Sequence, residues 1–397
     1  MSDFESAAAL FAAHFSNGFI PAPHPSGMMD SIAVPGRVNL IGEHIDYHNL
    51  PVLPMAIGRK IRLAFRPRED RVIRGSSSSF GDREFHWTSR LEPSSLGDWV
   101  NYVKAAAQAV EGRWKLPRGI DAAVASDLPP AAGLSSSSAL LTGFTLALLR
   151  ANGVRTSFQE LMEVLPEGEY FVGTRGGGMD HAAVLAGKPG CAILVNFAPI
   201  SVTAIAIPDD WAFLIAHSLT TAEKSGEVRA KYNSRRTAGS NALRRLGFDT
   251  FREAINRHGS DELSAMAERH LEGDEQRCFL HVITEAARVS NAVTAMQQDD
   301  AGAFGRLLDD SHQSLRDQLQ VSCPALDSLV EHARAAGALG ARLTGGGFGG
   351  CAVILCRAGE RERVAAGLID RFYRHQPGFD PHVHLIAAEP SAGALCE

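Results

Sequence analysis

Hydrophobic and polar positions alternate in some segments of the first half of the chain and recur at helical spacing in others. Alternation predicts strands, and apolar residues three to four positions apart predict helices. Strands are expected at residues 31–41, 61–65 and 191–197, and helices at residues 5–16 and 98–110. Residues 119–153 combine both patterns, because a strand, a loop of small residues and a long apolar helix ending at Gly153 follow one another.

The second half of the chain is mainly helical in its pattern. Helical spacing covers residues 221–247, 249–259, 274–300 and 300–315, and strand patterns return at 340–356 and 382–390. Helices and strands do not alternate strictly, so the pattern predicts an α+β fold. We expect two domains, an N-terminal one over residues 1–205 and a helix-rich C-terminal one over residues 206–397.

Composition and charge narrow the class of protein. The chain has 397 residues, of which 45% are hydrophobic, and a formal net charge of −6. A mildly acidic chain without a long basic run is not typical of a nucleic-acid-binding protein. The cysteines lack metal-binding spacing, the N-terminus lacks the basic residues of a signal peptide, and no apolar run is long enough to cross a bilayer. These features predict a cytoplasmic protein with no nucleic-acid or membrane partner.

A loop of small residues followed by four serines is the strongest candidate for a phosphate-binding site. In LPPAAGLSSSSAL (residues 128–140), a strand ends and Gly133 precedes the serines that enter the next helix. A helix N-terminus offers unpaired N–H groups and the positive end of its dipole, which together attract anions. The chain has no Walker A motif. An ordinary serine-capped helix is the alternative, but four consecutive serines favour phosphate.

Two further glycine-rich segments accompany this loop. In TGGGFGGC (residues 344–351), glycines before a strand allow the backbone to approach another group closely. In GTRGGGMDHAAVLAG (residues 173–187), three glycines place Asp180 near the start of a short helix, where the helix dipole alone would also favour a carboxylate. Together with the serine loop, these segments fit a protein that holds a nucleotide between two domains.

The densest group of polar residues lies near the N-terminus between apolar positions. GRVNLIGEHIDYHNLPVLP (residues 36–54) contains Arg37, Glu43, His44 and Asp46. Polar and charged side chains in an apolar setting need partners, because burying them unpaired is costly. We therefore expect this stretch to bind a ligand.

These segments, in this order, resemble the signature motifs of the GHMP small-molecule kinases. PGRVNLIGEHIDY, followed by VLP, resembles the galactokinase signature, and WVNYVK, GLSSSSA, GGGMD and GARLTGGGFGGC are also similar to galactokinase segments. GEHIDY, VLPMAI, the four serines and GTRGGGMD look closer to the N-acetylgalactosamine kinase branch. The resemblance implies a two-domain α+β fold with the active site between the domains. It also implies transfer of the γ-phosphoryl group of ATP to the C1 hydroxyl of a galactose-type sugar, with Mg²⁺.

The resemblance assigns roles to individual residues. Asp180 matches the catalytic aspartate that takes or orients the proton of the C1 hydroxyl, and Arg37 matches the arginine beside it. An arginine cannot act as a base, but it can keep Asp180 ionised and stabilise charge on the phosphoryl group. The remaining matches are to the sugar (Glu43, His44, Asp46, Gly177 and Tyr232), to ATP (Trp99, Gly133, Ser135, Ser136, Ser137 and Ser138) and to Mg²⁺ (Ser137).

Three of these assignments have open alternatives. The glutamate that galactokinases carry before the catalytic aspartate falls on Gly168 here, and Glu169 and Glu167 flank it. We favour Glu169 as the second ligand of Mg²⁺. Trp99 could line the adenine pocket or pack in the core, and Tyr232 could contact the sugar or lie on a helix surface.

The choice of sugar depends on residues that depart from the family pattern. His48–Pro51 stands where the family commonly has residues of the Asn-Gly-Gly type, and His181 follows the aspartate where the family usually has glutamine. His181 could contact substrate, but packing is the simpler interpretation. Galactose is the first expectation for the substrate, with N-acetylgalactosamine or arabinose as alternatives, and a monomer is favoured.

Two other functions compete with a sugar kinase. A GHMP kinase for mevalonate or homoserine would share the serine loop but not GEHIDY, which argues against it. A sugar sensor that binds sugar and ATP to recruit a protein partner could have lost the phosphate loop or the catalytic aspartate. Both are intact in this chain, so the sensor ranks below the kinase.

Overall fold

The computed structural model describes residues 3–15, 29–129, 132–173, 176–221 and 226–396. Parts of four predicted segments lie outside the described residues, namely residue 16 of the predicted helix at 5–16, 130–131 of the serine loop, 174–175 of the glycine segment before Asp180, and 222–225 of the predicted helix at 221–247. None of the described helices is both long and apolar enough to cross a membrane. The sheets and helices are mixed as expected for an α+β fold.

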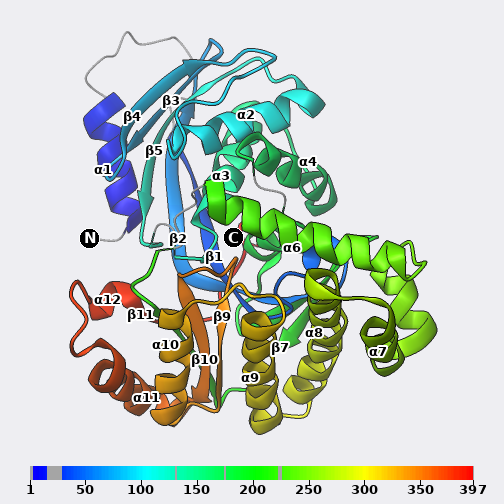
Figure 1. Ribbon diagram of the computed structural model, residues 1–397. Coiled ribbons are helices and arrows are strands. Elements are labelled where there is room, and N and C mark those ends of the chain that lie inside the picture. The colour runs from blue at the N-terminus through cyan, green and yellow to red at the C-terminus, as the bar shows by residue number, and fades with distance from the viewer. Residues whose placement is uncertain (1–2, 16–28, 130–131, 174–175, 222–225, 397) are drawn as a thin grey trace.

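A five-stranded sheet forms the framework of the N-terminal half (Figure 1). Its strands lie in the order β1-β2-β5-β3-β4, and all neighbours are antiparallel except β3 and β5. The bounds are β1 (Asp30–Ile41), β2 (Leu53–Pro67), β3 (Val72–Ser77), β4 (Gly81–His86) and β5 (Ile120–Ser126). A separate pair of strands, β6 (Cys191–Asn196) and β7 (Ser201–Ala206), follows in the chain.

Helices cover both faces of this sheet. On one face, α1 (Asp3–Phe15) contacts β2 and β5, and on the other, α3 (Ser136–Ala151) contacts β1 and β2. Three more helices pack around α3, and their bounds are α2 (Val100–Trp114), α4 (Phe158–Phe171) and α5 (Met179–Ala186). Local signals explain where the helices begin: the Asp98 carboxylate accepts a hydrogen bond from the Val100 N–H at 3.1 Å, and Ser157 and Glu160 form a capping box.

The C-terminal half contains a four-stranded antiparallel sheet in the order β11-β8-β10-β9. Its strands are β8 (Trp211–His217), β9 (Gly340–Thr344), β10 (Cys351–Arg357) and β11 (Leu385–Ala387). The helices of this half are α6 (Gly226–Arg245), α7 (Phe251–His270), α8 (Gly273–Gln297), α9 (Ala301–Asp317), α10 (Pro324–Ala335), α11 (Arg361–Leu368) and α12 (Pro381–His384). Short 3₁₀ turns at Asp46–His48 and Ala358–Glu360 and a π-helical turn at Ile369–Tyr373 complete the fold.

The predicted strand at residues 382–390 is wrong at its start. His382–His384 lie in α12, where the Asp380 side chain caps the helix by accepting a bond from the His382 N–H at 2.9 Å. Only Leu385–Ala387 pair as a strand, with β8. The local cap therefore decides the conformation of the residues that come before the paired segment.

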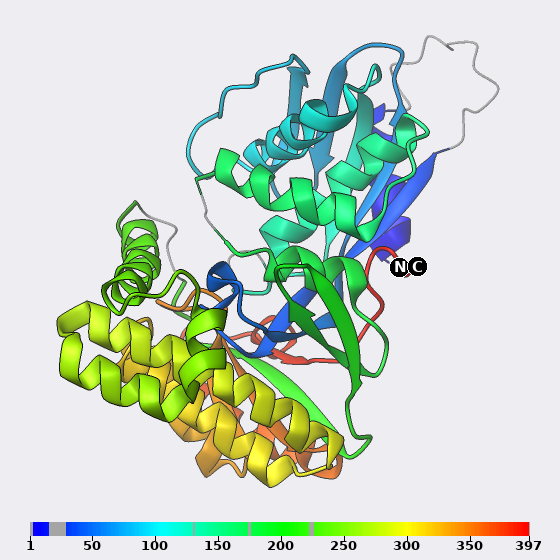
Figure 2. The same ribbon diagram turned by 90° about the vertical axis from the view of Figure 1, so that its right-hand side faces the viewer.

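The first strand connects the two halves of the molecule. β1 starts in the N-terminal sheet and continues into the lower half, where it contacts α8, α9, β9 and β10 (Figure 2). Every residue of β1 from Val34 to Ile41 is buried, so apolar residues are expected there, yet Arg37 and Asn39 are among them. Two buried polar residues on a central strand need specific partners.

The end of the chain returns to the N-terminal half. The Ser391 N–H donates to the Ala56 carbonyl at 3.0 Å, and the Gly393 N–H donates to the Gly187 carbonyl at 2.8 Å. The chain passes from the strands of the N-terminal half to the four-stranded sheet between β7 and β8, and the domain boundary predicted after residue 205 falls at the end of β7.

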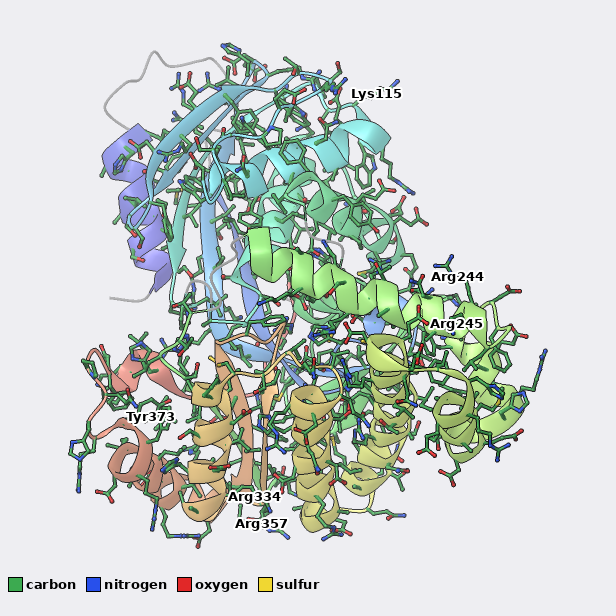
Figure 3. The ribbon with its side chains drawn as sticks, viewed as in Figure 1. Lys115, Arg244, Arg245, Arg334, Arg357 and Tyr373 are labelled. Atoms are coloured by element: carbon green, nitrogen blue, oxygen red, sulfur yellow. The ribbon has the colours of Figure 1, made fainter. Side chains whose placement is uncertain are left out.

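The labelled arginine side chains lie at two separate places on the molecule. Arg244 and Arg245 lie at the end of α6, and Arg334 and Arg357 lie at the far end of the C-terminal half (Figure 3).

Candidate active site

A cavity of about 240 Å³ is lined by residues from both halves of the chain. Its walls come from the polar stretch at the end of β1, the serine loop before α3, the glycine segment before α5, helix α6 and the glycine-rich loop between β9 and β10. The predicted site residues that line it are Arg37, Glu43, His44, Asp46, Gly133, Ser135, Ser136, Ser137, Glu169, Gly177, Asp180 and Tyr232. Trp99 and Ser138 are predicted site residues that do not line it.

Asp180 and Arg37 form a close ion pair in this cavity. Asp180 lies in the first turn of α5, and its Oδ1 accepts bonds from Nε and Nη2 of Arg37, both at 2.7 Å. The Ser135 hydroxyl donates to the other oxygen, Oδ2, at 2.6 Å. Burial alone would raise the pKa of Asp180, but the charge and hydrogen bonds of Arg37 and the bond from Ser135 outweigh it and lower the pKa. The carboxylate is therefore ionised at neutral pH.

Arg37 also connects the ion pair to the serine loop. Its Nη1 donates to the Gly133 carbonyl at 2.6 Å, so one guanidinium binds both the carboxylate and the loop. Burial acts to lower the pKa of Arg37, but Asp180 opposes this and leaves the pKa raised. A planar guanidinium with fixed donors suits such a double role better than a lysine.

The two glycine-rich loops meet beside this pair. Gly345 has a φ of +86°, and a Cβ on it would lie 3.0 Å from the Gly133 carbonyl oxygen. Residues 344–350 line the cavity together with Gly133 and the serines that follow it. Small residues therefore leave backbone N–H groups and hydroxyls accessible at one wall, as phosphate binding requires.

Glu169 lines the same cavity from α4, the helix that precedes the glycine segment before Asp180. Its Oε1 accepts a bond from the Ser138 hydroxyl at 2.8 Å and lies 3.3 Å from Nε2 of His181. Ser138 is buried behind the loop, and the His181 ring is fully buried with Nδ1 at 3.4 Å from the Thr142 hydroxyl. Packing thus accounts for His181, as the simpler interpretation has it.

The oxygen atoms of Ser137 and Glu169 suit a magnesium ion. Among the described residues, no cluster of three or more His, Cys, Asp or Glu side chains could hold a metal ion. Mg²⁺ in nucleotide sites needs no such cluster, because one or two protein oxygens combine with phosphate oxygens and water. Ser137 and Glu169 line one cavity with Asp180, so the residues present fit the ion.

The polar stretch after β1 forms the opposite wall. The Gly177 N–H donates to Oδ2 of Asp46 at 3.0 Å, and a Cβ on Gly177 would lie 2.3 Å from the Asp46 carbonyl carbon. Burial first, and then the charge of Asp180, raise the pKa of Asp46 to about 6. His44 packs against Tyr232 with ring centroids 5.1 Å apart, and burial lowers the pKa of His44 to about 3. This wall therefore presents a neutral imidazole, a phenol and carboxylates.

Trp99 occupies a position in the N-terminal core. Its ring packs 6.4 Å from the Phe144 ring and directly against Gly75, where a Cβ would lie 2.6 Å from the indole. Core packing is the interpretation that this position supports, and a contact with adenine stays a prediction. Tyr102, one helical turn further along α2, lines the cavity instead. Tyr102 lies three residues after Trp99, and this helical spacing could have identified Tyr102 from the sequence.

The loop that departs from the family pattern lies behind the cavity wall. His48 packs against Phe251 with ring centroids 4.6 Å apart, and Leu50 is buried. None of the residues His48–Pro51 lines the cavity. The cavity is also lined by Val172 and Asn233, which no motif in the sequence marks as site residues.

Comparisons with known proteins identify the family of the chain. Residues 101–188 match the family model "GHMP kinases N terminal domain", residues 292–375 match "GHMP kinases C terminal", and residues 30–67 match "Galactokinase galactose-binding signature". The chain is 36% identical over 343 residues to the galactokinase of Chloroflexus aurantiacus, covering 85% of this chain and 86% of the relative. It is 32% identical over 370 residues to the galactokinase of Mycobacterium bovis, covering 93% of this chain and 100% of the relative.

The fold is also similar to that of a solved galactokinase. The crystal structure of Lactococcus lactis galactokinase complexed with galactose superimposes with a TM-score of 0.85 at 26% sequence identity, covering 98% of this chain and 99% of the other. The galactose-binding signature spans β1, the polar turn and β2, and β1 and the turn supply residues that line the cavity. On these grounds, the chain belongs to the galactokinase family of the GHMP kinases.

Proposed function

We propose that this protein is an ATP-dependent galactokinase, which converts galactose and ATP to galactose 1-phosphate and ADP. The observation that carries the proposal is the ionised Asp180, held 2.7 Å from Arg37 in a cavity between the galactose-binding signature and the serine loop. The curated relatives are galactokinases, and the similar crystal structure contains galactose.

Asp180 and Arg37 are the proposed catalytic residues. Phosphoryl transfer passes through a loose transition state, so positioning and charge stabilisation matter more than a strong base. Asp180, ionised beside Arg37, can accept or orient the proton of the C1 hydroxyl as the oxygen attacks the γ-phosphorus. Arg37 offers positive charge next to the transferred group.

The opposite wall is the proposed sugar site. Glu43, His44, Asp46, Tyr232 and the backbone of Gly177 line it, and they supply donors and acceptors for several hydroxyls. A site built to bind hydroxyl groups rejects analogues that lack them, because its buried polar groups are then left unpaired. The proposed substrate is galactose, in agreement with the matched signature.

The serine loop is the proposed phosphate site. Gly133, Ser135, Ser136 and Ser137 line the cavity at the start of α3, where the helix dipole favours an anion. Mg²⁺ would be held by Ser137 and Glu169 together with the ATP phosphates, and when bound it neutralises charge on the β- and γ-phosphate oxygens. The cytoplasmic location and the monomeric state stay predictions from the sequence.

The test is an assay of ADP release by the purified protein with MgATP and a panel of sugars. Galactose is expected to give turnover, and the product should carry its phosphate on C1, as nuclear magnetic resonance can establish. N-acetylgalactosamine and arabinose distinguish a galactokinase from a kinase for a related sugar. Binding of galactose and ATP without ADP release would instead support the sensor, and the proposal would then fail.

A further inference from the structure

The turn that carries Glu43 has an unusual backbone conformation. Gly42 has a φ of +101° and His44 a φ of +63°, so two residues of one short turn are in the left-handed region. The register between β1 and β2 also shifts between Asn39 and Ile41, just before the turn. A non-glycine residue stays in this region only where its surroundings determine the conformation strongly. The turn is held by side chains of the C-terminal half.

Arg342, on β9 of the C-terminal half, holds the Glu43 side chain. Its guanidinium is fully buried, and Nη2 donates to Oε2 of Glu43 at 2.6 Å. The Asn39 amide donates to the same oxygen at 3.1 Å, and the Gly345 backbone N–H is a further donor to this carboxylate. Nη1 of Arg342 donates to the carbonyl oxygens of Asn39 at 3.1 Å and Leu40 at 2.9 Å. One guanidinium thus fixes both the carboxylate and the strand that leads to it.

Glu285, on α8, holds the backbone of the same turn. Its Oε1 accepts bonds from the N–H groups of Gly42 at 2.9 Å and Glu43 at 3.2 Å, and from the Ser311 hydroxyl at 2.8 Å. Its Oε2 accepts a bond from Nε of Arg288 at 2.7 Å. Burial alone would raise the pKa of Glu285, but Arg288 and other nearby charges lower it to about 2, so this acceptor is ionised.

A histidine on the same helix binds the remaining side of the turn. Nε2 of His281 lies 3.0 Å from the Glu43 carbonyl oxygen, and its Nδ1 lies 2.8 Å from the Ser314 hydroxyl. The side chains that hold the turn are those of Arg342, Glu285 and His281, and all three come from the C-terminal half. None of the three lines the cavity. They can influence a ligand only through Glu43 and its neighbours.

We propose that Arg342 and Glu285 are positioning residues for sugar binding. They fix the Glu43 carboxylate and the Gly42–Glu43 backbone from the C-terminal half, so that Glu43, which lines the cavity, is held in one orientation. The inference rests on the proposed function, because that function assigns Glu43 to the sugar. It extends the sugar site to residues that never touch the substrate and lie about 240 to 300 positions later in the chain.

The first test is the variant Arg342→Lys. Lysine keeps the positive charge, but its ammonium group lacks the planar set of N–H donors that binds the carboxylate and two carbonyls at once. Loss of a charged hydrogen bond that orients Glu43 should raise the KM for galactose about 10- to 100-fold, with the KM for ATP within about twofold of the wild type. The second test is Glu285→Asp, which keeps the charge beside Arg288 but withdraws the oxygen from the turn, and the same selective rise is expected.

The matched control is Asp121→Asn. Asp121 is a buried carboxylate on β5, paired with Arg66 at 2.8 Å and Arg68 at 2.7 Å, and it does not line the cavity. This variant should unfold at lower denaturant concentration than the wild type, yet leave the KM for galactose unchanged. It separates general loss of a buried ion pair from loss of orientation at Glu43.

A panel of galactose analogues that each lack one hydroxyl makes the test specific. The analogue that lacks the hydroxyl bound by Glu43 should show nearly the same KM with the wild type and with Arg342→Lys, because the misplaced carboxylate no longer matters to it. An equal effect of the variant on every analogue would overturn the proposal. So would equal rises of both KM values, unchanged KM for galactose in folded variants, or failure of both variants to fold.

Failure of the proposed function would be recognised separately. In that case the wild-type protein itself would release no ADP with any sugar of the panel. Calorimetric titration with galactose would then still decide the positioning inference, since Arg342→Lys should weaken galactose binding about 10- to 100-fold without reference to turnover. Unchanged galactose affinity in that variant would overturn it.

Discussion

Asp180 and Asp46 are buried carboxylates of one cavity, yet their pKa values are shifted in opposite directions. The pKa of Asp180 is lowered because Arg37 and Ser135 overcome the effect of burial. Asp46 has only backbone N–H donors against burial and the charge of Asp180, and its pKa is raised to about 6. Two similar groups therefore acquire different roles from their surroundings, one as a fixed charge and one as a carboxyl that titrates near neutral pH.

Replacing Asp180 with asparagine should remove catalysis while preserving sugar binding. The amide keeps the size and a hydrogen-bond acceptor but loses the charge that accepts or orients the hydroxyl proton. We expect kcat to fall on the order of 10²- to 10⁴-fold. Steady-state assays should show the fall, and calorimetry should find galactose affinity within a few-fold of the wild type. Turnover near the wild-type rate would remove Asp180 from the mechanism.

Asp46 should make the ligand-free protein less stable as the pH rises. Its pKa is about 6 in the folded protein against 3.8 for an ordinary aspartate, so the folded state binds more protons between these values. The raised pKa therefore contributes about 3 kcal/mol to the free energy of unfolding. This contribution is fully present below about pH 4 and is lost as the pH rises through about 6.

The variant Asp46→Asn tests this sign. Denaturant unfolding at pH 5 and pH 7.5, without sugar, should show the stability of the variant relative to the wild type increasing with pH, because only the wild type loses stability at Asp46. The other carboxylates are common to both proteins and cancel in the difference. A relative stability that is constant or decreases over this range would contradict the raised pKa.

At the scale of elements, the segment before α5 and the polar turn are in very close contact. A Cβ on Gly177 would lie 2.3 Å from the Asp46 carbonyl carbon and 2.4 Å from the Tyr47 nitrogen, which are backbone atoms that cannot rotate away. Gly177→Ala should push α5, and Asp180 with it, away from the turn. We expect a loss of about 1 to 3 kcal/mol of stability and a higher KM for galactose.

Gly112→Ala is the matched control for this substitution. Gly112 lies in α2, and a Cβ there would meet no atom within 4 Å. Alanine should therefore stabilise the helix by about 0.5 to 1 kcal/mol and leave both KM values unchanged. Denaturant unfolding and steady-state kinetics on the two variants provide the comparison. Equal effects of the two substitutions would show that the close contact at Gly177 has no special consequence.

Elements with a strong apolar pattern were predictable from the sequence, and those without one were not. The helix patterns at residues 5–16 and 98–110 correspond to α1 and α2, and the strand pattern at 31–41 corresponds to β1. β4 was not predicted because its residues are almost all exposed, so no alternation marks it. Pairing with β3 in the folded protein, rather than a local signal, makes it a strand.

The candidate site was predictable where its residues lie in short motifs. Arg37, Glu43 and Asp180 lie in such motifs, and the structure brings them to one cavity. Arg342 lies in the segment GARLTGGGFGGC and Glu285 in no motif, yet neither could be assigned to Glu43, because a single charged residue in a strand or helix does not reveal its partner. Their bonds join residues 299 and 242 positions apart, and only the folded chain defines such pairs.

The whole molecule should unfold as one unit. A single cluster of buried side chains includes Val38 and Leu40 of β1 together with Phe279 of α8 and Phe304 of α9, so the core is continuous across the two halves. The final residues of the chain also bind back to the N-terminal half through Ser391 and Gly393.

Ligand binding should therefore raise the melting temperature of the whole chain. Galactose at 100 times its Kd contributes about 2.7 kcal/mol to the folded state. Differential scanning calorimetry is expected to show one transition that moves upward as a whole, and MgATP should move the same transition. Two transitions, of which galactose moves only one, would contradict a continuous core.

The contact between Arg342 and Glu43 also determines when the site forms during synthesis. The two residues are 299 positions apart, so at 5 to 20 residues per second the ribosome needs roughly 15 to 60 s to reach the arginine after it has made the glutamate. Throughout that interval the polar turn is present without the guanidinium that holds it, and for most of the interval α8 is absent as well. A nascent chain that has left the ribosome only up to β8 thus carries every matched residue of the galactose-binding signature and still has no formed sugar site.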